Sequence, residues 1–353
     1  MTHAEATFCT VTDAVYFLGT VALLNSLRLT GHEGELVVLD CGLRLEQRHA
    51  LAARARVVPM PADHVGKPEY AKAAAALAAS TDVLLVLDSD IIVTGSLGGL
   101  IAEASSGRVC AFPDRRASRR FAEWEALLRL ATSPRAGETY VNTGVVALST
   151  RSWPSLLGRW HEANARAAVY ELARRSPRLP LDVDPLGNSD QDVLNALLMS
   201  ELPVGATLVL DQEAAPQSHL APFVSVVDEH ALSCRCRDRE TLLVHVTAMP
   251  KPWEPAGWRA TAYPAFRQLL PRVLCGDDVV LRLRPATVPP WLRPGLRGRT
   301  VRALSGAAAN LAGAAVHALP APLRARVLRS IRSAPYRRRA RDRATGARTG
   351  QSD

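Results

Sequence analysis

A short apolar run that ends in two carboxylates constrains this chain more than any other feature. Residues 83–87 (VLLVL) are apolar without a break, and Asp88, Ser89 and Asp90 follow at once. An unbroken run of branched apolar residues of this length is typical of a strand buried on both faces of a parallel sheet. Ligands of such sheets bind beyond the carboxyl ends of the strands, so Asp88 and Asp90 are expected at the mouth of a cleft.

The two carboxylates also have the chemistry of a cation site. Alternate residues of an extended chain point the same way, so Asp88 and Asp90 could share one ion whose coordination a phosphate completes. Hard oxygen ligands of this kind suit Mg²⁺ or Mn²⁺. A strand that merely ends in solvated acids has the same pattern, so D-x-D alone leaves both interpretations open.

Strand-like and helix-like apolar patterns alternate on both sides of this run. Further strands are expected at 6–11, 35–39, 56–59, 108–112, 140–148 and 241–246, and helices at 17–29, 45–53, 70–79, 115–130, 153–176 and 190–199. This alternation predicts an α/β fold, with a mostly parallel central sheet and helices on both faces. Within it, the charged segment 115–130 is expected to be mobile or to face an acceptor.

The length of 353 residues suits one large domain with an extension. We predict an α/β domain at 1–281, a linker rich in Pro and Arg at 282–299, and a basic tail at 300–353. The formal net charge is +9, yet from residue 291 onward the chain is rich in Arg, lacks Lys and has only two acids, so the body before it is mildly acidic. A mildly acidic body is not the footprint of a nucleic-acid-binding protein.

Apolar residues in the tail recur at helical spacing between arginines. That pattern is typical of a basic amphipathic helix on an anionic membrane surface, with a disordered basic tail as the alternative. No apolar run is long enough to span a bilayer, and the sequence begins without a basic-then-apolar leader. The six cysteines lack metal-ligand spacing, so we expect reduced thiols in a cytoplasmic protein, associated with the inner face of the membrane if the tail binds there.

Polar residues at the ends of other expected elements add to a possible binding site. Asn142 lies on a strand, where its amide needs partners that a ligand can supply. Asp190 and Gln191 open a helix, where acids stabilise the N-terminus and where both side chains could instead bind sugar hydroxyls. His245 closes a strand, either as a structural residue or as a third ligand acceptable to Mn²⁺. Lys251 follows and suits a diphosphate as a point charge.

Taken in order, the segments LDSD, YVNTGV, NSDQDVLN and HVTAMPKPW resemble glycosyltransferase family 8, which includes glycogenin and bacterial lipopolysaccharide galactosyl- and glucosyltransferases. The resemblance covers about residues 6–270. It implies a GT-A fold and a retaining enzyme that uses Mn²⁺ or Mg²⁺. The donor would be a nucleotide-sugar, usually UDP-linked, and the acceptor of its hexosyl group a glycan, a lipid-linked sugar or another hydroxyl compound.

The resemblance also implies roles for individual residues. Asp88, Asp90 and His245 match the metal ligands, and Asp190 and Gln191 match contacts to the donor sugar at the reaction centre. The implied donor-binding residues are Thr10, Thr12, Tyr16, Lys72, Asp88, Ser89, Asn142 and Lys251. Because an amide is a poor nucleophile, front-face attack guided by the leaving phosphate is favoured over a covalent intermediate. The family motif H-x-x-G-x-x-K-P-W is altered here, with Ala248 in place of Gly.

Two other functions fit parts of the pattern. Phosphatases of the haloacid dehalogenase type also place D-x-D after a buried strand, with Asp88 as the phosphorylated nucleophile and Asp90 as the acid. They need a downstream lysine and an acidic pair, which Lys251 and Asp277–Asp278 mimic. Their motif normally lies near the start of the domain, however, whereas residues 1–82 precede it here. A non-catalytic protein that binds sugar nucleotides at a membrane is the third possibility.

Overall fold

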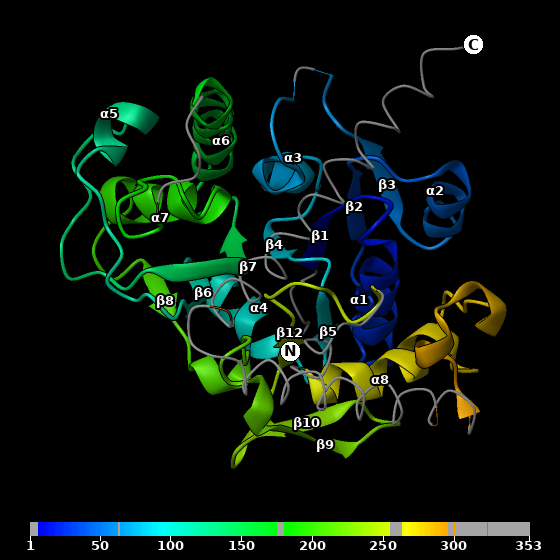
Figure 1. The fold of residues 1–353 in the computed structure, drawn as a ribbon. Helices are drawn as coiled ribbons and strands as arrows, with labels where there is room; N and C mark the ends of the chain where they lie inside the picture. Colours follow the sequence, from blue (N-terminus) through cyan, green and yellow to red (C-terminus); the bar gives the residue numbers. More distant parts are fainter. Residues whose placement is uncertain are drawn as a thin grey trace, which may run out of the picture.

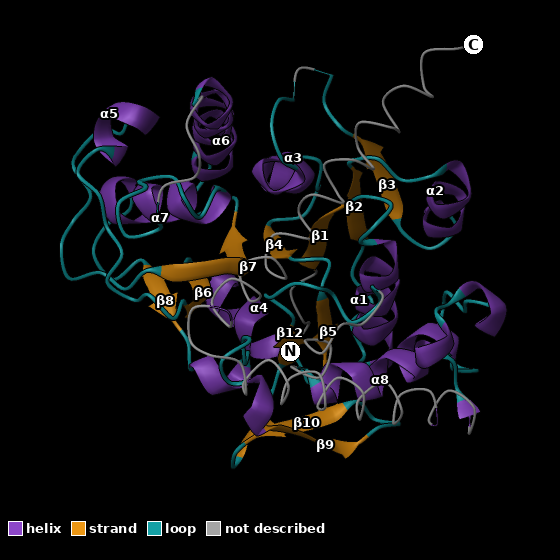
Figure 2. Ribbon diagram, viewed as in Figure 1, coloured by secondary structure: helices purple, strands orange, loops and turns teal. Residues whose placement is uncertain are grey.

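The computed structural model describes residues 6–62, 64–174, 180–254 and 263–295, together with the single residues 300 and 323. The predicted amphipathic tail at 300–353 lies outside the described residues, apart from these two positions. Within the described part, no helix is long and apolar enough to cross a membrane. Figures 1 and 2 show a central sheet with helices on both sides.

The central sheet has seven strands in the order β3-β2-β1-β4-β7-β6-β8. Their bounds are β1 (Ala6–Thr12), β2 (Leu36–Asp40), β3 (Arg56–Pro59), β4 (Val83–Leu87), β6 (Val109–Pro113), β7 (Val141–Ser149) and β8 (Thr207–Val209). Strands β3, β2, β1 and β4 are mutually parallel, β6 and β8 are parallel, and β7 runs antiparallel to both of its neighbours. The predicted, mostly parallel α/β sheet is confirmed. Since β7 is antiparallel, its first residues lie at the edge where β4 ends.

Two apolar cores cover the two faces of this sheet. One contains residues of α1 (Phe17–Leu29), α4 (Gly98–Ser105) and α8 (Pro264–Cys275). The other contains residues of α3 (Lys72–Leu77), α5 (Trp124–Leu128), α6 (Leu156–Ala173) and α7 (Asp190–Glu201). Along β4, Leu85 and Leu87 join the first core, whereas Leu84 and Val86 join the second. Burial on both faces therefore explains why this strand is apolar at every position.

Smaller elements complete the described chain. Strand β5 (Ile91–Val93) pairs antiparallel with β12 (Leu243–His245), and a second small sheet contains β9 (Val224–Asp228), β10 (Ser233–Cys236) and β11 (Arg239–Glu240). Helix α2 (Leu45–Ala52) lies beside β3 (Figure 1). Short 3₁₀ turns occur at Pro68–Ala71, Gln212–Ala214, Ala221–Phe223, Pro285–Thr287 and Pro290–Leu292. Pairing of β5 with β12 sets His245 opposite Ile91, the residue after Asp90.

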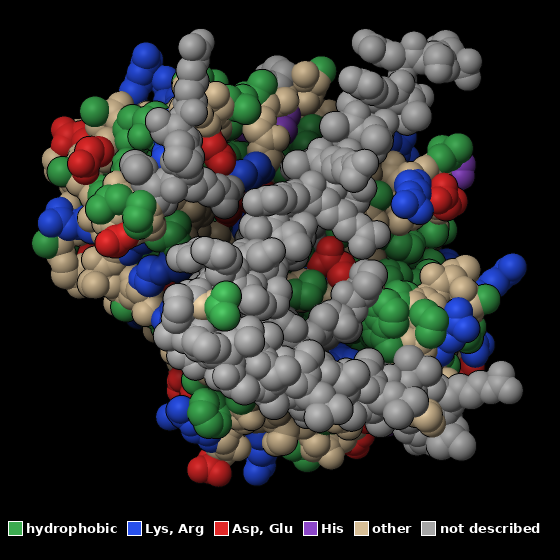
Figure 3. Space-filling model, viewed as in Figure 1, with side chains coloured by type: hydrophobic (Ala, Val, Ile, Leu, Met, Phe, Trp, Pro, Cys, Tyr) green, Lys and Arg blue, Asp and Glu red, His purple; other side chains and the backbone are tan. Residues whose placement is uncertain are grey.

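Two stretches differ from the sequence-based expectation. The helix expected at 115–130 is reduced to α5, because Arg119 turns inward and its guanidinium pairs with the buried carboxylate of Asp192. The segment expected to be a linker packs against the first core through Val288 and Leu292, which are fully or almost fully buried. On the face of the molecule that Figure 3 shows, basic and acidic side chains are interspersed among the described residues.

Candidate active site

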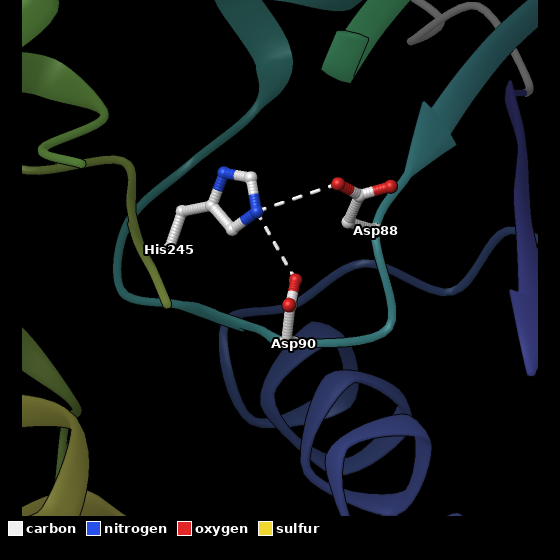
Figure 4. Close-up of side chains that lie close together, drawn as sticks. All are labelled: Asp88, Asp90 and His245. Carbon is white, nitrogen blue, oxygen red and sulfur yellow. Dashed lines mark ion pairs between the residues drawn. The ribbon is translucent and has the colours of Figure 1, made fainter. Parts of the chain in front are cut away.

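Three side chains predicted to bind a cation converge where β4 ends. The Nε2 atom of His245 lies 3.4 Å from Oδ2 of Asp88 and 3.1 Å from Oδ1 of Asp90 (Figure 4). One ligand atom from each residue lies within 4.8 Å of the others. Two carboxylates and an imidazole form a donor set that suits Mn²⁺. Asp88 and Asp90 lie on either side of Ser89 after β4, and His245 is brought in by the pairing of β12 with β5.

Space around the cluster is kept free by Gly144 on β7. A Cβ atom at this position would lie 2.2 Å from Cε1 of His245 and 2.9 Å from Oδ2 of Asp88. Any other residue would therefore push into the side chains of His245 and Asp88, and into that of Asn142 at 2.8 Å. The absence of a side chain at this position, together with the donor set, fits a bound ion.

Lysines neutralise the carboxylates of the cluster. The ammonium of Lys72 lies 2.7 Å from Oδ1 of Asp88 and 2.9 Å from Oδ2 of Asp190. The ammonium of Lys251 lies 2.5 Å from Oδ2 of Asp90 and donates a hydrogen bond to the carbonyl of Val246. Lys72, Asp90 and Lys251 are nearly completely buried. Burial of so much charge is tolerable because each ion has a close partner of opposite sign.

These neighbours shift the pKa values in directions that follow from the contacts. Burial favours neutral imidazole, but Asp90 and Asp88 outweigh it and raise the pKa of His245 to about 9. Burial would also raise the pKa of Asp90, yet Lys251 and His245 hold it well below its usual range. For Asp190 burial prevails over the opposing effect of Lys72 and raises the pKa to about 6. The region is thus a desolvated array of alternating charges.

Amide and hydroxyl groups form the wall next to this array. The side chain of Asn142 donates from Nδ2 to Oε1 of Gln191 at 2.9 Å, and Thr143 donates from Oγ1 to Oδ2 of Asp190 at 2.9 Å. Asn142 lies at the start of β7, while Asp190 and Gln191 open α7. The structure brings these predicted sugar-binding residues together beside the cation cluster.

The opposite end of the cleft is bounded by the end of β1 and the segment before α1. Thr12 and Tyr16 line it, as do Ser89 and Lys251. The ring of Tyr16 packs edge-on against Trp253, with centroids 6.0 Å apart, and Trp253 donates from Nε1 to the carbonyl of Val15. Thr10 is different, since it is buried within β1 and is not among the described residues that line the cleft.

Comparison with known proteins gives a match in structure alone. No family model matches the sequence, and no curated protein matches it. The crystal structure of galactosyltransferase LgtC in complex with donor and acceptor sugar analogues aligns with a TM-score of 0.51 and 19% identity, covering 81% of this chain and 99% of that one. The structure of an active-site mutant of LgtC aligns with a TM-score of 0.50 and 19% identity, covering 75% of this chain and 94% of that one.

The chain has a GT-A fold. The fold implied by the resemblance to glycosyltransferase family 8 is therefore confirmed. In this GT-A fold the cleft has a volume of about 660 Å³, which is in the usual range for a small-molecule site.

The cleft also contains residues to which no sequence motif gave an individual role, although two of them belong to the charged segment 115–130, for which the sequence predicts mobility or contact with an acceptor. Asp114, Arg115 and Arg116 follow β6, and a second group comes from the loop at 217–219. The first group had a usable signal, because it follows an expected strand as Asp88 does. The second had none, since the loop precedes a small sheet that the sequence did not indicate. Burial lowers the pKa of His219, and nearby Arg115 lowers it further.

Proposed function

We propose that this protein is a metal-dependent, retaining glycosyltransferase that moves a hexosyl group from a UDP-sugar to a hydroxyl acceptor. One observation carries the proposal: Asp88, Asp90 and His245 converge in the same cleft as Asn142 and Gln191. A cation site beside a wall of amides suits a ligand that joins a diphosphate to a sugar. The GT-A fold supports the same conclusion.

In this proposal the residues divide the donor among them. Asp88, Asp90 and His245 would hold Mn²⁺ or Mg²⁺, and a bound ion would supply positive charge that balances the departing diphosphate. Lys251 adds a positive charge beside that group, so the protein contributes mainly electrostatic stabilisation. Tyr16 and Thr12 contact the nucleoside, while Ser89, Lys72, Asn142, Asp190 and Gln191 contact the donor sugar and its phosphate.

The hydrogen bonds and the ion pair of the two candidate nucleophiles, Asp190 and Gln191, support retention by front-face attack. The carboxylate of Asp190 is bound by Lys72 and Thr143, and the amide oxygen of Gln191 accepts from Asn142. Both groups are already engaged in these contacts, which favours front-face attack over attack by either residue. We expect an α-linked donor to give an α-linked first product by NMR, and a β-linked first product would contradict the mechanism.

A phosphatase is supported less well by the geometry. Its acidic pair would be Asp277 and Asp278, but both are exposed and neither is among the described residues that line the cleft. Two assays separate the functions: release of UDP from a panel of UDP-sugars with Mn²⁺, and hydrolysis of p-nitrophenyl phosphate with Mg²⁺. We expect UDP release alone, and hydrolysis of the phosphoester alone would overturn the proposal. Mn²⁺-dependent binding of UDP without release from any donor would instead favour a non-catalytic binder.

Association of a cytoplasmic enzyme with an anionic membrane surface stays a prediction for the tail at 300–353. A deletion that tests it has to begin at residue 301, because Val288 and Leu292 are buried in the first core and an earlier cut would expose that core. We expect the full chain to sediment with anionic liposomes at low salt and the deletion variant to stay in solution. Equal sedimentation would contradict the prediction.

A further inference from the structure

The order of strands at the edge of the sheet arranges the cleft from one end to the other. Strands β1, β4, β7 and β6 are consecutive neighbours. Tyr16 follows β1, the cation cluster follows β4, and Asn142 lies at the start of β7. Phe112 on β6 pairs with Asn142, so Asp114, Arg115 and Arg116 come directly after this pair. If the nucleoside lies at β1 and the sugar at β7, the segment after β6 lies beyond the sugar, where the acceptor enters.

Cations in the cleft differ in how they are neutralised. Lys72 pairs with Asp88 and Asp190, Lys251 pairs with Asp90, and Lys67 pairs with Glu171. By contrast, no carboxylate in the described chain lies within ion-pair distance of the guanidinium of Arg115 or Arg116. The nearby carboxylate of Asp114 instead accepts a hydrogen bond from the backbone N–H of Arg116 at 2.8 Å.

The guanidinium of Arg116 is nonetheless held in place. It donates from Nη1 to Oδ1 of Asn188 at 2.9 Å, and Asn188 in turn donates from Nδ2 to the hydroxyl of Tyr140 at 3.0 Å. Tyr140 is fully buried and donates to Asp192. A neutral amide thus orients Arg116 without cancelling its charge, which leaves other N–H groups of the fork available. A planar guanidinium of this kind matches the two oxygens of a carboxylate or a phosphate.

We propose that the acceptor carries an oxyanionic group, a phosphate or a carboxylate, that binds Arg115 and Arg116. The assignment rests on the proposed transferase function and specifies its acceptor. Asp114 lies in the same wall and accepts hydrogen bonds, so it suits a hydroxyl of the same acceptor. The cleft then holds one anionic group at each end, the donor diphosphate against Lys251 and the cation cluster, and the acceptor oxyanion against the arginines.

A binding experiment on the full chain tests this proposal. Glucose, glucuronate and glucose 6-phosphate are titrated by calorimetry into protein saturated with UDP and Mn²⁺, so that the diphosphate site is already filled. We expect the two anionic sugars to bind about tenfold more tightly than glucose, with a preference that falls as salt rises. The stronger of the two identifies the oxyanion. In the double variant R115Q/R116Q, the anionic sugars should bind no more than about twofold more tightly than glucose.

Arg120 provides the matched control. It is exposed, lies four residues after Arg116 and donates to the carbonyl of Pro134, so R120Q should keep the full preference. Equal binding of all three sugars to the wild type, or a preference that survives in R115Q/R116Q, would overturn the proposal. The proposal would also be overturned if R116Q raised the KM for UDP-glucuronate more than the KM for UDP-glucose and left the acceptor preference unchanged. The arginines would then bind the donor sugar.

Failure of the transferase proposal has a separate signature. If UDP with Mn²⁺ does not raise the melting temperature of the wild type, the donor site is misassigned. The preference of the arginine pair for anionic sugars is then measured with the same three sugars in the absence of UDP. If the wild type prefers the anionic sugars and R115Q/R116Q does not, the proposal of an anion site at the two arginines stands. If the wild type shows no such preference, that proposal is wrong.

Discussion

Two carboxylates in the first turn of α7 have opposite surroundings, although they are only two residues apart. Asp190 faces Lys72 and Thr143 and lines the cleft. Asp192 is fully buried, pairs with Nε and Nη2 of Arg119 at 2.6 and 2.8 Å and accepts from Tyr140. Residues two apart on a helix point to different sides of its axis.

The comparison separates charge that a ligand can reorganise from charge that supports the fold. Lys72 is shared by Asp190 and Asp88, and Lys251 borders the same cleft, so water or a donor can replace a lost partner. Arg119 is as buried as the two lysines, but it does not line the cleft among the described residues, so no ligand of the cleft can replace a lost partner. Changes on the cleft side should therefore affect transfer, and changes around Asp192 should affect stability.

The largest effect is expected at Asp90 on the cleft side. D90N removes a charged ligand of the cation, and we expect transfer with Mn²⁺ to fall by about 10³-fold or more, equivalent to about 4 kcal/mol. Cooperative unfolding should be kept, because Lys251 still donates to the carbonyl of Val246. UDP release and a denaturation curve measure the two quantities. D228N, at an exposed position on β9, is the control, and near wild-type turnover by D90N would show that the cation site is elsewhere.

On the other side of the comparison, D192N removes the charge that balances Arg119. We expect the free energy of unfolding to fall by about 3 kcal/mol, which is at the lower end of the cost of breaking a buried ion pair. The lower end applies because Arg119 also donates to the carbonyls of Leu181 and Asp184. Urea denaturation measures this change. A loss of less than about 0.5 kcal/mol, the range of an ordinary surface substitution, would mean that Asp192 does not support the fold.

The smallest of the three effects is expected for D190N. Transfer should fall by about 10²-fold, because the sugar contact and the orientation of Lys72 are both weakened. Stability should change by less than about 1 kcal/mol, since Lys72 retains its contact with Asp88. D192N serves as its partner variant, measured by the same two assays. If D190N unfolds more easily than D192N, the division between the two carboxylates is wrong.

The sequence predicted the cation cluster and the helix that begins at Asp190, and the family resemblance assigned Asp190 and Gln191 to the donor sugar, but nothing in the sequence indicated that Asp192 is the buried partner of Arg119. Asp190 and Asp192 are both acids at the start of a helix, and the inward turn of Arg119, which is 73 residues from Asp192 along the chain, separates their roles. Long-range contacts of this kind leave no local pattern. The same holds for β7, whose apolar composition predicted a strand but carried no information on its antiparallel direction.

Short or irregular elements also could not be predicted from the sequence. Strands β8 and β11 have three and two residues, too few for a period to be recognised. Residues 115–119 belong to the segment predicted to be helical, yet their turns are fixed by the carboxylates of Asp114 and Asp192. By contrast, α1 was predicted with the bounds observed, because its apolar spacing is regular over thirteen residues.

Gly144 lets the main chain of β7 form the floor beneath Asp88 and His245, with no room for even one methyl group. A floor made of backbone cannot be reshaped by exchanging side chains. Directed evolution of this protein toward other sugars therefore has to work through the rim, at Asp114–Arg116 and the loop at 217–219. Libraries that hold position 144 as glycine and vary those six positions would explore new acceptors while the cation site is kept.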